Sequence, residues 1–467
     1  MMGPPTHTAV FLTGNLMKHV VRMSLTASIG LMAMFAVDFV DMIFISMLGN
    51  DSLAAAVGYA GTLLFFTNSI NIGLSIAAGS LTSQSLGAGR STEGREYATN
   101  VALFALITGL ALPALILTNC NSILALLGAE GEVQRLATRY VTIILPTMWV
   151  MGVAMTAMAI LRANGDAQRS MTCTLYGGAV NAVLDPILIF GLGMGLDGAA
   201  IASVIARLVM MALALRPALL VYHSFARPSV SAALRDFGAI STIAIPAVLA
   251  NVATPVGNAI VTREIAQFGT NAVAGMAVIG RLMPVSFAVI FALSGAIGPI
   301  IGQNYGAGAA GRVRESFSAG IRFTAVYVVL MTALLFFLRA PIAGLFDATG
   351  ETRVLIYLFC GPLALALFFN GVIFVANASF NNLSHPIYST WINWGRHTLG
   401  TWPFAILGAQ IAGASGVLIG QAAGGVIFAI IALWLAKRVM TNLSKPKAPE
   451  AFSPHGRLHV LFGRRGW

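Results

Sequence analysis

Charged side chains are scarce in this sequence, and their scarcity excludes most classes of protein. Of the 467 residues only 9% are Asp, Glu, Lys or Arg, whereas 57% are hydrophobic. Soluble globular proteins carry about 25% charged residues, so the composition excludes a water-soluble enzyme or binding module. A disordered chain is excluded as well, because disorder requires high charge and few apolar residues.

Cysteine is equally rare, and it gives no sign of metal chemistry. The three cysteines, Cys120, Cys173 and Cys360, are far apart and match no metal-ligand spacing. We interpret them as small core residues. Residues 87–90 (Gly-Ala-Gly-Arg) are not a phosphate-binding loop, because no Lys-Ser/Thr follows them. The sequence therefore predicts no cofactor, and no metal apart from a coupling ion.

Long uncharged stretches are what the chain has in abundance. A helix needs about 20 apolar residues to cross a bilayer, and most of the chain divides into such lengths. Breaks at charged or Gly/Pro/Asn-rich positions predict twelve spans, at 19–47, 53–84, 96–119, 134–161, 168–192, 197–222, 237–268, 272–304, 314–338, 353–380, 386–410 and 413–437. We therefore expect an all-α polytopic membrane protein.

A polar break near the middle of the chain predicts two lobes of six spans each. We place the N-lobe at 19–222, an inter-lobe loop at 223–236 and the C-lobe at 237–437. An N-terminal segment, 1–18, and a basic tail, 438–467, flank them. With these segments in the cytoplasm, most of the 27 Lys and Arg residues fall on the cytoplasmic side, as the positive-inside rule requires. The rule also accounts for the net charge of +11 without nucleic acid.

The two halves repeat each other at a nearly constant offset. Gly49 matches Gly269 (269 − 49 = 220), and Gln84 matches Gln303 (303 − 84 = 219). Because each half has an even number of spans, both halves have the same orientation, related by a pseudo-two-fold axis along the membrane normal. Duplicated bundles of this kind are typical of secondary transporters, with the site between or within the halves.

Acidic residues inside the spans are the first candidates for function, because an unpaired charge in a membrane is costly. Asp38 and Asp41 are three residues apart and share one face of a helix. Two carboxylates this close cannot both ionise cheaply in a low dielectric, which suits a proton relay. The alternative is a structural role, in which either aspartate caps a kink or pairs with an arginine.

A second acidic position lies in the fifth span. Asp185 follows Asn181 by four residues, so both lie on one helix face, and Pro186 frees a backbone carbonyl near residue 182. These oxygen donors suit Na⁺ or a hydrogen-bonded proton. Alternatively, Pro186 only bends the helix and Asn181 bonds across helices. For Arg281 and Arg396 of the C-lobe, structural roles are the better interpretation.

These motifs resemble a known family. Residues 40–44 (Val-Asp-Met-Ile-Phe) with Leu48-Gly49 and 53–55 are similar to the first-span signature of the multidrug and toxic compound extrusion (MATE) family, and 181–203 resemble its fifth and sixth spans. The resemblance covers 18–438 and is closest to the DinF-like branch. It implies a V-shaped, twelve-helix exporter of the MATE/MOP type.

The resemblance also implies which residues bind the coupling ion. In similar proteins the N-lobe cation site uses the positions of Asp41, Asn181 and Asp185 together with a threonine, which is Ser203 here. Asp38 and Ala199 are auxiliary positions in this assignment. The ion is H⁺ or Na⁺, and any Na⁺ would occupy this same site.

The chain departs from the family pattern in the first span, and its two halves differ at the acidic positions. Thr26 stands where many members have a proline, although its repeat partner Pro246 is retained (246 − 26 = 220). In the C-lobe, Val261 and Trp402 stand at the positions that match Asp41 and Asp185. We therefore expect an asymmetric ion site, confined to the N-lobe.

These observations predict a secondary active multidrug efflux transporter, not an enzyme. It would exchange organic cations and other amphipathic compounds for H⁺ or Na⁺ by alternating access, as a monomer in the cytoplasmic (inner) membrane. Its expected partners are small-molecule substrates and the lipid bilayer, without nucleic acid.

Other functions fit the sequence less well. A lipid-linked sugar flippase or a dedicated metabolite exporter of the same superfamily remains the alternative. A major-facilitator transporter is disfavoured because residues 85–96 lack that family's loop motif. A channel is disfavoured because the internal acids lie in one half rather than in a ring, and a membrane enzyme would need a cluster of nucleophiles that is not seen.

Overall fold

The protein is all-helical over the residues that its computed structural model describes, 9–443. A 3-10 turn, η1 (Val10–Leu12), precedes the first long helix. Most of the predicted tail, from residue 444, lies outside the described residues, and so does the start of the N-terminal segment, residues 1–8.

The N-terminal half consists of six helical segments of membrane-spanning length, as the sequence predicts. They are α1 (Leu16–Met47), α2 (Asp51–Gly87), α3 (Ser91–Thr118), α5 with α6 (Gly131–Ile144 and Met148–Ala163), α7 (Ala167–Pro186) and α8 (Leu196–Leu220). A short helix, α4 (Cys120–Leu126), follows α3, and a 3-10 turn, η2 (Leu145–Thr147), joins α5 to α6. Pro186 ends α7 in a π-helical turn, η3 (Ile187–Gly191), because proline supplies no backbone donor.

The C-terminal half repeats this arrangement. Its helices are α9 (Val230–Ala266), α10 and α11 (Thr270–Ser286 and Ala288–Gly306), α12 (Ala310–Leu345), α13 and α14 (Gly350–Leu358 and Ala364–Asn382, joined by the π-helical turn η4, Phe359–Leu363), α15 (Ile387–His397) and α16 (Trp402–Thr441). The apolar stretch Ile387–Thr441 counts as one span by length alone. Non-helical backbone angles at Ala412 and Gly413 break it, so the described chain has twelve spans.

Glycines allow the last two spans to pack closely against each other. A Cβ atom at Gly416, Gly420 or Gly424 would meet the backbone carbonyl of Gly408, Phe404 or Gly400 respectively. The three glycines recur every fourth residue and so lie on one helix face. Small residues at this spacing allow backbone-to-backbone packing of membrane helices.

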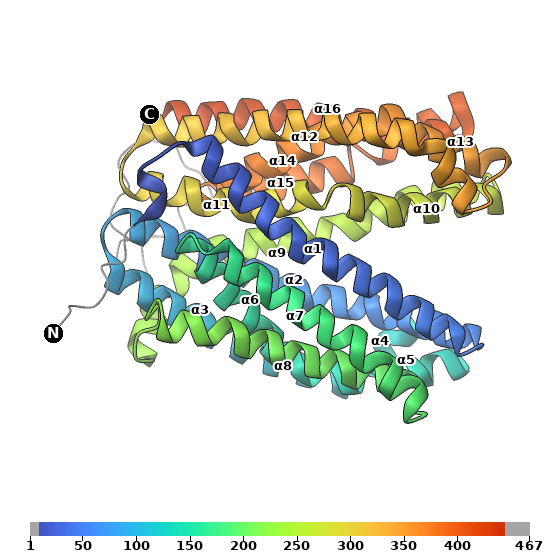
Figure 1. The fold of residues 1–467 in the computed structure, drawn as a ribbon, viewed down its shortest axis with the longest axis horizontal. Helices are drawn as coiled ribbons and strands as arrows, with labels where there is room; N and C mark the ends of the chain where they lie inside the picture. Colours follow the sequence, from blue (N-terminus) through green and yellow to red (C-terminus); the bar gives the residue numbers. More distant parts are fainter. Residues whose placement is uncertain (1–8, 444–467) are drawn as a thin grey trace.

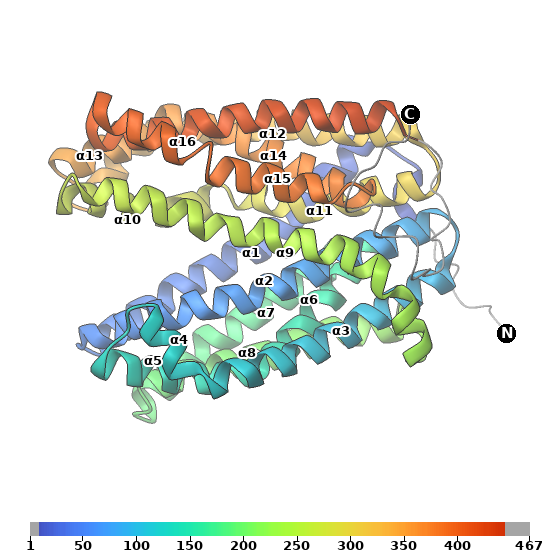
Figure 2. The ribbon, with the colours of Figure 1, turned by 180° about the vertical axis from the view of Figure 1, so that it is seen from behind.

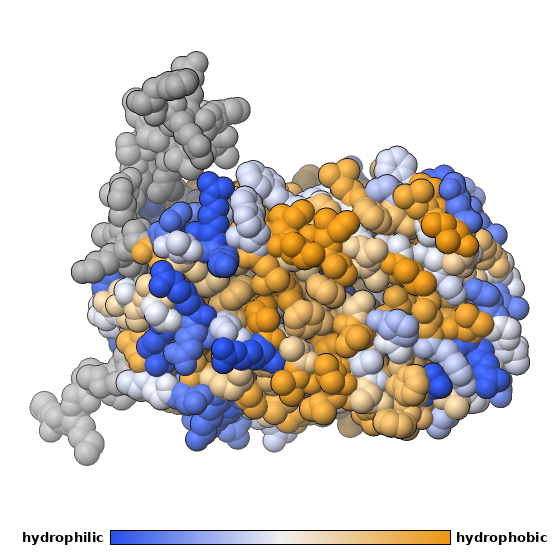
Figure 3. All heavy atoms as spheres, turned by 90° about the horizontal axis from the view of Figure 1, so that it is seen from above, coloured by the Kyte–Doolittle hydropathy of each residue, from blue (hydrophilic) through white to orange (hydrophobic). Residues whose placement is uncertain are grey.

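The two halves form two separate bundles (Figures 1 and 2). The bundles converge at the end of the molecule where α1 begins and α16 ends, which we call the terminus end, and diverge toward the other end. A belt of hydrophobic residues lies between more hydrophilic ends (Figure 3). Such a belt is what a protein surrounded by lipid requires.

The lobes are joined tightly at the terminus end, and the joint has pseudo-two-fold symmetry. Gly87 of α2 lies against the carbonyl of Gln303 on α11, and its repeat partner Gly306 lies against the carbonyl of Gln84. Hydrogen bonds cross between the lobes nearby, from Gln84 Nε2 to Asn382 O (3.2 Å) and from Gln303 Nε2 to Ala163 O (2.8 Å). The motif that reveals the repeat in the sequence therefore forms the inter-lobe crossing.

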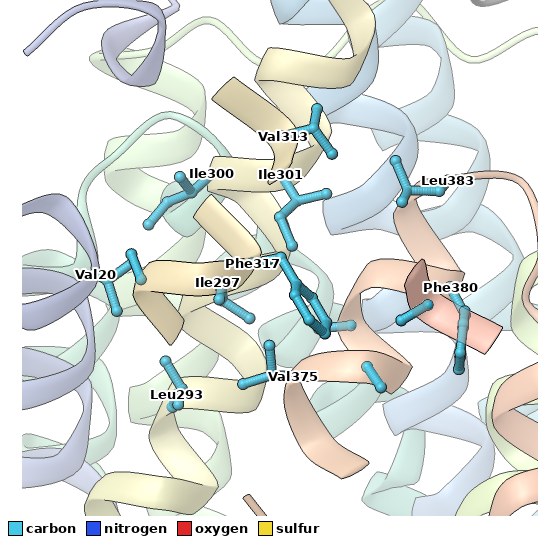
Figure 4. Packing of buried hydrophobic residues seen from close by; sticks show 14 of the residues in the cluster. Val20, Leu293, Ile297, Ile300, Ile301, Val313, Phe317, Val375, Phe380 and Leu383 are labelled. Atoms are coloured by element: carbon cyan, nitrogen blue, oxygen red, sulfur yellow. The ribbon is translucent and has the colours of Figure 1, made fainter. Parts of the chain in front are cut away.

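Apolar packing supports the same joint. Isoleucines of α11, among them Ile297 and Ile300, lie between α1 and the C-lobe helices α12 and α14 (Figure 4). Val20 contributes from α1, and Phe317 and Val375 contribute from the other side. Because α1 packs against both lobes, it is placed to connect events in one lobe to the other.

Candidate functional site

The site predicted from the sequence lies where α1 packs along α7. A Cβ atom at Gly30 would contact the Met171 carbonyl at 3.2 Å, and one at Gly178 would contact Val37 at 3.3 Å. Further along both helices the rings of Phe44 and Phe190 meet edge to face, with centroids 5.9 Å apart. These contacts place Asp41 opposite Asp185, because both helices run in the same direction with matching register.

Asp41 and Asp185 lie within hydrogen-bonding reach of each other. Asp185 is fully buried, and Asn181 Nδ2 donates to its Oδ1 at 3.2 Å. Asp41 Oδ1 and Asp185 Oδ2 are also buried, and among the described residues no side chain or backbone group donates a hydrogen bond to either. Two carboxylates this close repel each other while both are ionised, and a proton or a metal cation bound between them removes that repulsion. The arrangement can therefore bind H⁺ or Na⁺.

The structure brings only some of the remaining predicted residues to this pair. Asp38 lies one turn before Asp41 on α1, as expected, and is exposed. Ser203 is half-buried on α8. In the part of the chain that the structure describes, no hydrogen bond joins it to Asp41, Asn181 or Asp185. Ala199, also on α8, is buried and has no polar side chain, so it could contribute only its backbone.

Sequence reasoning overlooked a tyrosine near the acids. The charges of Asp38, Asp41 and Asp185 all act on the phenol of Tyr140, which lies on α5. Arg207 of α8 also lies in this region, and its Nη1 donates to Ile144 O (3.3 Å) and Thr147 Oγ1 (3.2 Å). Arg207 thus satisfies a carbonyl that becomes free where η2 interrupts the helix. A polar residue next to a proline-broken span is the signal that could have identified this region.

The C-lobe residues at the positions of Asp41 and Asp185 are apolar, and neither lies in a polar site. Val261 is fully buried in a hydrophobic cluster with residues of α10, α13 and α16, and Trp402 is exposed. Asp41 and Asp185 therefore have no acidic counterpart at the matching positions of the second lobe. Arg281 of α10, expected to be structural, reaches across to α1, with its guanidinium 5.4 Å from the Phe39 ring.

The sequence pattern of one family matches this chain twice, over residues 26–187 and 246–407. The two matches are displaced by 220 residues at both ends (246 − 26 and 407 − 187), which confirms the internal repeat. The chain belongs to the MatE family. Members of this family are membrane transporters and not enzymes.

Relatives and solved structures agree with this membership. The FAD transporter of Shewanella oneidensis is 27% identical over 430 residues, which cover 90% of this chain and 94% of that protein. The multidrug export protein MepA of Staphylococcus aureus is 25% identical over 373 residues, covering 77% and 80%. The MATE transporter VcmN of Vibrio cholerae, in the crystal structure of a point mutant, superimposes with a TM-score of 0.86 at 24% identity, covering 92% of this chain and 98% of that one. The multi-pass, two-lobe MATE fold is thereby established.

Proposed function

We propose that the protein is a secondary active exporter of small amphipathic compounds, driven by entry of H⁺ or Na⁺ at the Asp41–Asp185 pair. The observation that carries this proposal is the proximity of the Asp41 and Asp185 carboxyl groups, each with a buried oxygen that accepts no hydrogen bond from the described residues. Such a pair costs free energy while both groups are charged and releases it on binding a cation. Asn181 orients Asp185 through its amide hydrogen bond.

The proposal includes a direction. If both termini are cytoplasmic, as the distribution of Lys and Arg indicates, the joint of Gln84, Gly87, Gln303 and Gly306 closes the cytoplasmic side. The lobes then diverge toward the outside of the cytoplasmic membrane. A state open to the outside is the one in which an exporter releases substrate and takes up the coupling ion. We propose that the protein does so as a monomer.

Substrate and ion would be coupled through the same negative charge. While Asp41 is ionised, a cationic substrate in contact with it is stabilised; binding of a proton or Na⁺ removes that attraction. Reciprocity then requires the substrate to weaken ion binding by the same factor. Because the acids are confined to the N-lobe, ion binding acts first on α1 and α7.

Organic cations and related drugs are the leading substrate class, in line with the MepA relatives that are named for multidrug export. A dedicated metabolite exporter is the second candidate. It is favoured by the relative named as an FAD transporter, which aligns over nearly the whole of both proteins.

The decisive experiment measures ion-driven transport by reconstituted protein. In proteoliposomes with an imposed H⁺ or Na⁺ gradient, Asp41→Asn is expected to abolish gradient-driven movement of a fluorescent organic cation, because the isostere removes the charge and little volume. Asp347→Asn is the matched control, since Asp347 is exposed on a loop remote from α1.

Two outcomes would contradict the proposal. Near-normal gradient-driven transport by Asp41→Asn would remove Asp41 from the coupling mechanism. Failure of both H⁺ and Na⁺ gradients to drive transport by the unmodified protein would contradict secondary active export.

A further inference from the structure

An arginine near the terminus end of the N-lobe has no acidic partner in the part of the chain that the structure describes. Arg162 lies in the last turn of α6, and its Nη1 donates to Ser170 Oγ on α7 at 2.9 Å. Among the described residues no carboxylate lies within ion-pair distance of Arg162, and its other N–H groups make no hydrogen bond. The neighbouring arginine of α7 differs, because Arg169 Nη1 is paired with Asp166 Oδ2 at 2.9 Å.

The guanidinium of Arg162 approaches the opposite lobe at a glycine of α11. A Cβ atom at Gly295 of α11 would lie 3.8 Å from Arg162 Nε and within 4 Å of no other described atom outside its own helix. Within α11, only Ser294 and Gly295 are exposed, whereas residues 292, 293 and 296–304 are buried. Ser294 and Gly295 therefore interrupt a buried stretch of α11 beside Arg162, and we call this exposed pair the Ser294–Gly295 notch.

Aromatic rings lie one turn away on the same face of α11. Phe291 precedes Gly295 by four residues, so both lie on one face. Its ring meets that of Phe35 from α1, with centroids 6.4 Å apart, and that of Phe374 from α14, at 5.5 Å. All three rings are half-buried. Aromatic surface from both lobes therefore adjoins an arginine that no acid of residues 9–443 neutralises.

We propose that Arg162, the Ser294–Gly295 notch and the Phe291 ring form a subsite for a planar aromatic substrate that carries an anionic group, such as a phosphate. The guanidinium offers several N–H donors in a planar fork, which suits phosphate and carboxylate oxygens. The absence of a side chain at Gly295 leaves room for that group, and the phenylalanines stack against the ring system. The inference rests on the proposed export function and assigns part of its substrates to a class other than cations.

A matched pair of probes separates the anionic group from the ring. Riboflavin and riboflavin 5′-phosphate share one fluorescent ring system and differ by a phosphate. Binding to the purified full chain in detergent, followed by fluorescence anisotropy, is expected to be tighter for the phosphate ester. Arg162→Gln should weaken its binding about tenfold to a hundredfold, as for loss of a charged hydrogen bond, and leave riboflavin binding unchanged.

Further variants make the test specific. Arg162→Lys keeps the charge but loses the fork, so an intermediate affinity is expected. Phe291→Leu should weaken both probes by a similar factor. Arg169→Gln is the control, since the Arg169 guanidinium is already paired, and it should change neither affinity.

The proposal is overturned if the unmodified protein binds the phosphate ester no more tightly than riboflavin. It is also overturned if Arg162→Gln affects both probes equally or affects neither. The first comparison needs no variant, so it decides the matter even if Arg162→Gln does not fold. Because binding is measured without a gradient, its result is independent of whether ion-driven transport through Asp41 is observed.

Discussion

At the scale of single residues, the most informative contact is the one between Asn181 and Asp185. The amide donates to one carboxylate oxygen of Asp185, and the other oxygen accepts no hydrogen bond from the described residues. Asn181 therefore acts through Asp185, by fixing the direction in which its free oxygen points. A cation bound there would have ligands from two helices, so occupancy would pull α1 and α7 together.

Because they serve one site, changes at these two residues should not be additive. Asn181→Ala and Asp185→Asn are each expected to weaken apparent ion affinity about tenfold, as for loss of a buried ligand. The double variant should be little worse than Asp185→Asn alone. Apparent affinity is read from the ion dependence of transport in proteoliposomes, with Asn271→Ala, an exposed asparagine of α10, as control.

If the two effects simply multiply, the residues do not share a site. Ser203→Ala serves as an internal comparison. With no hydrogen bond from Ser203 to the acids in the described chain, a change of less than about threefold is expected, since water can replace one neutral ligand.

At the scale of elements, prolines interrupt two spans of the N-lobe beside polar residues of the candidate site. Pro146 and Pro186 lie at a 3-10 and a π-helical turn, next to Arg207 and Asp185 respectively. By contrast α1, with Thr26 where many relatives have proline, is one continuous helix from Leu16 to Met47. Its response to ion binding must therefore be a rigid shift or a bend without a proline hinge.

Replacing a packed glycine and an exposed glycine by alanine should change the free energy of unfolding in opposite directions. Gly420→Ala should destabilise the protein by about 1–3 kcal/mol, because its Cβ would overlap the Phe404 carbonyl. Gly280→Ala, on an exposed position of α10 with no described atom within 4 Å, should instead be neutral or stabilising by up to about 1 kcal/mol.

Both effects can be followed as shifts of thermal unfolding in detergent, monitored by size-exclusion chromatography. Equal shifts for the two variants would show that the close packing of the last two spans is unimportant for stability.

At the scale of the whole molecule, orientation decides what the inter-lobe joint does. The same crossing of α2 and α11 is a cytoplasmic gate if the termini are cytoplasmic and an external one if they are not. Single cysteines at positions 90 and 227, near the terminus end, should react only with a reagent on the cytoplasmic side. One at position 130, at the opposite end, should react only from outside.

Labelling intact cells with a membrane-impermeant maleimide measures this directly. The native cysteines, Cys120, Cys173 and Cys360, are buried and give little background. External labelling of position 227 in intact cells would reverse the predicted topology and, with it, the assignment of the gate.

Composition and repetition were enough to predict the twelve spans and the two lobes, because hydrophobic length and internal similarity are properties of the chain alone. Asp41, Asn181 and Asp185 were chosen on other grounds, the cost of charge inside a membrane and the family resemblance, and their role as a cation site stays a prediction. That Asp41 and Asp185 belong to one site was implied by the family resemblance. Composition and spacing alone could not pair them, because the pairing depends on the register between α1 and α7, which packing at Gly30 and Gly178 determines. The place of Arg162 could not be predicted either: its sequence position reads as a positive charge at a helix end. Only the packing of α6 against α11, with a glycine and not a side chain at 295, leaves that guanidinium half-buried between the lobes, with no acidic partner among the described residues.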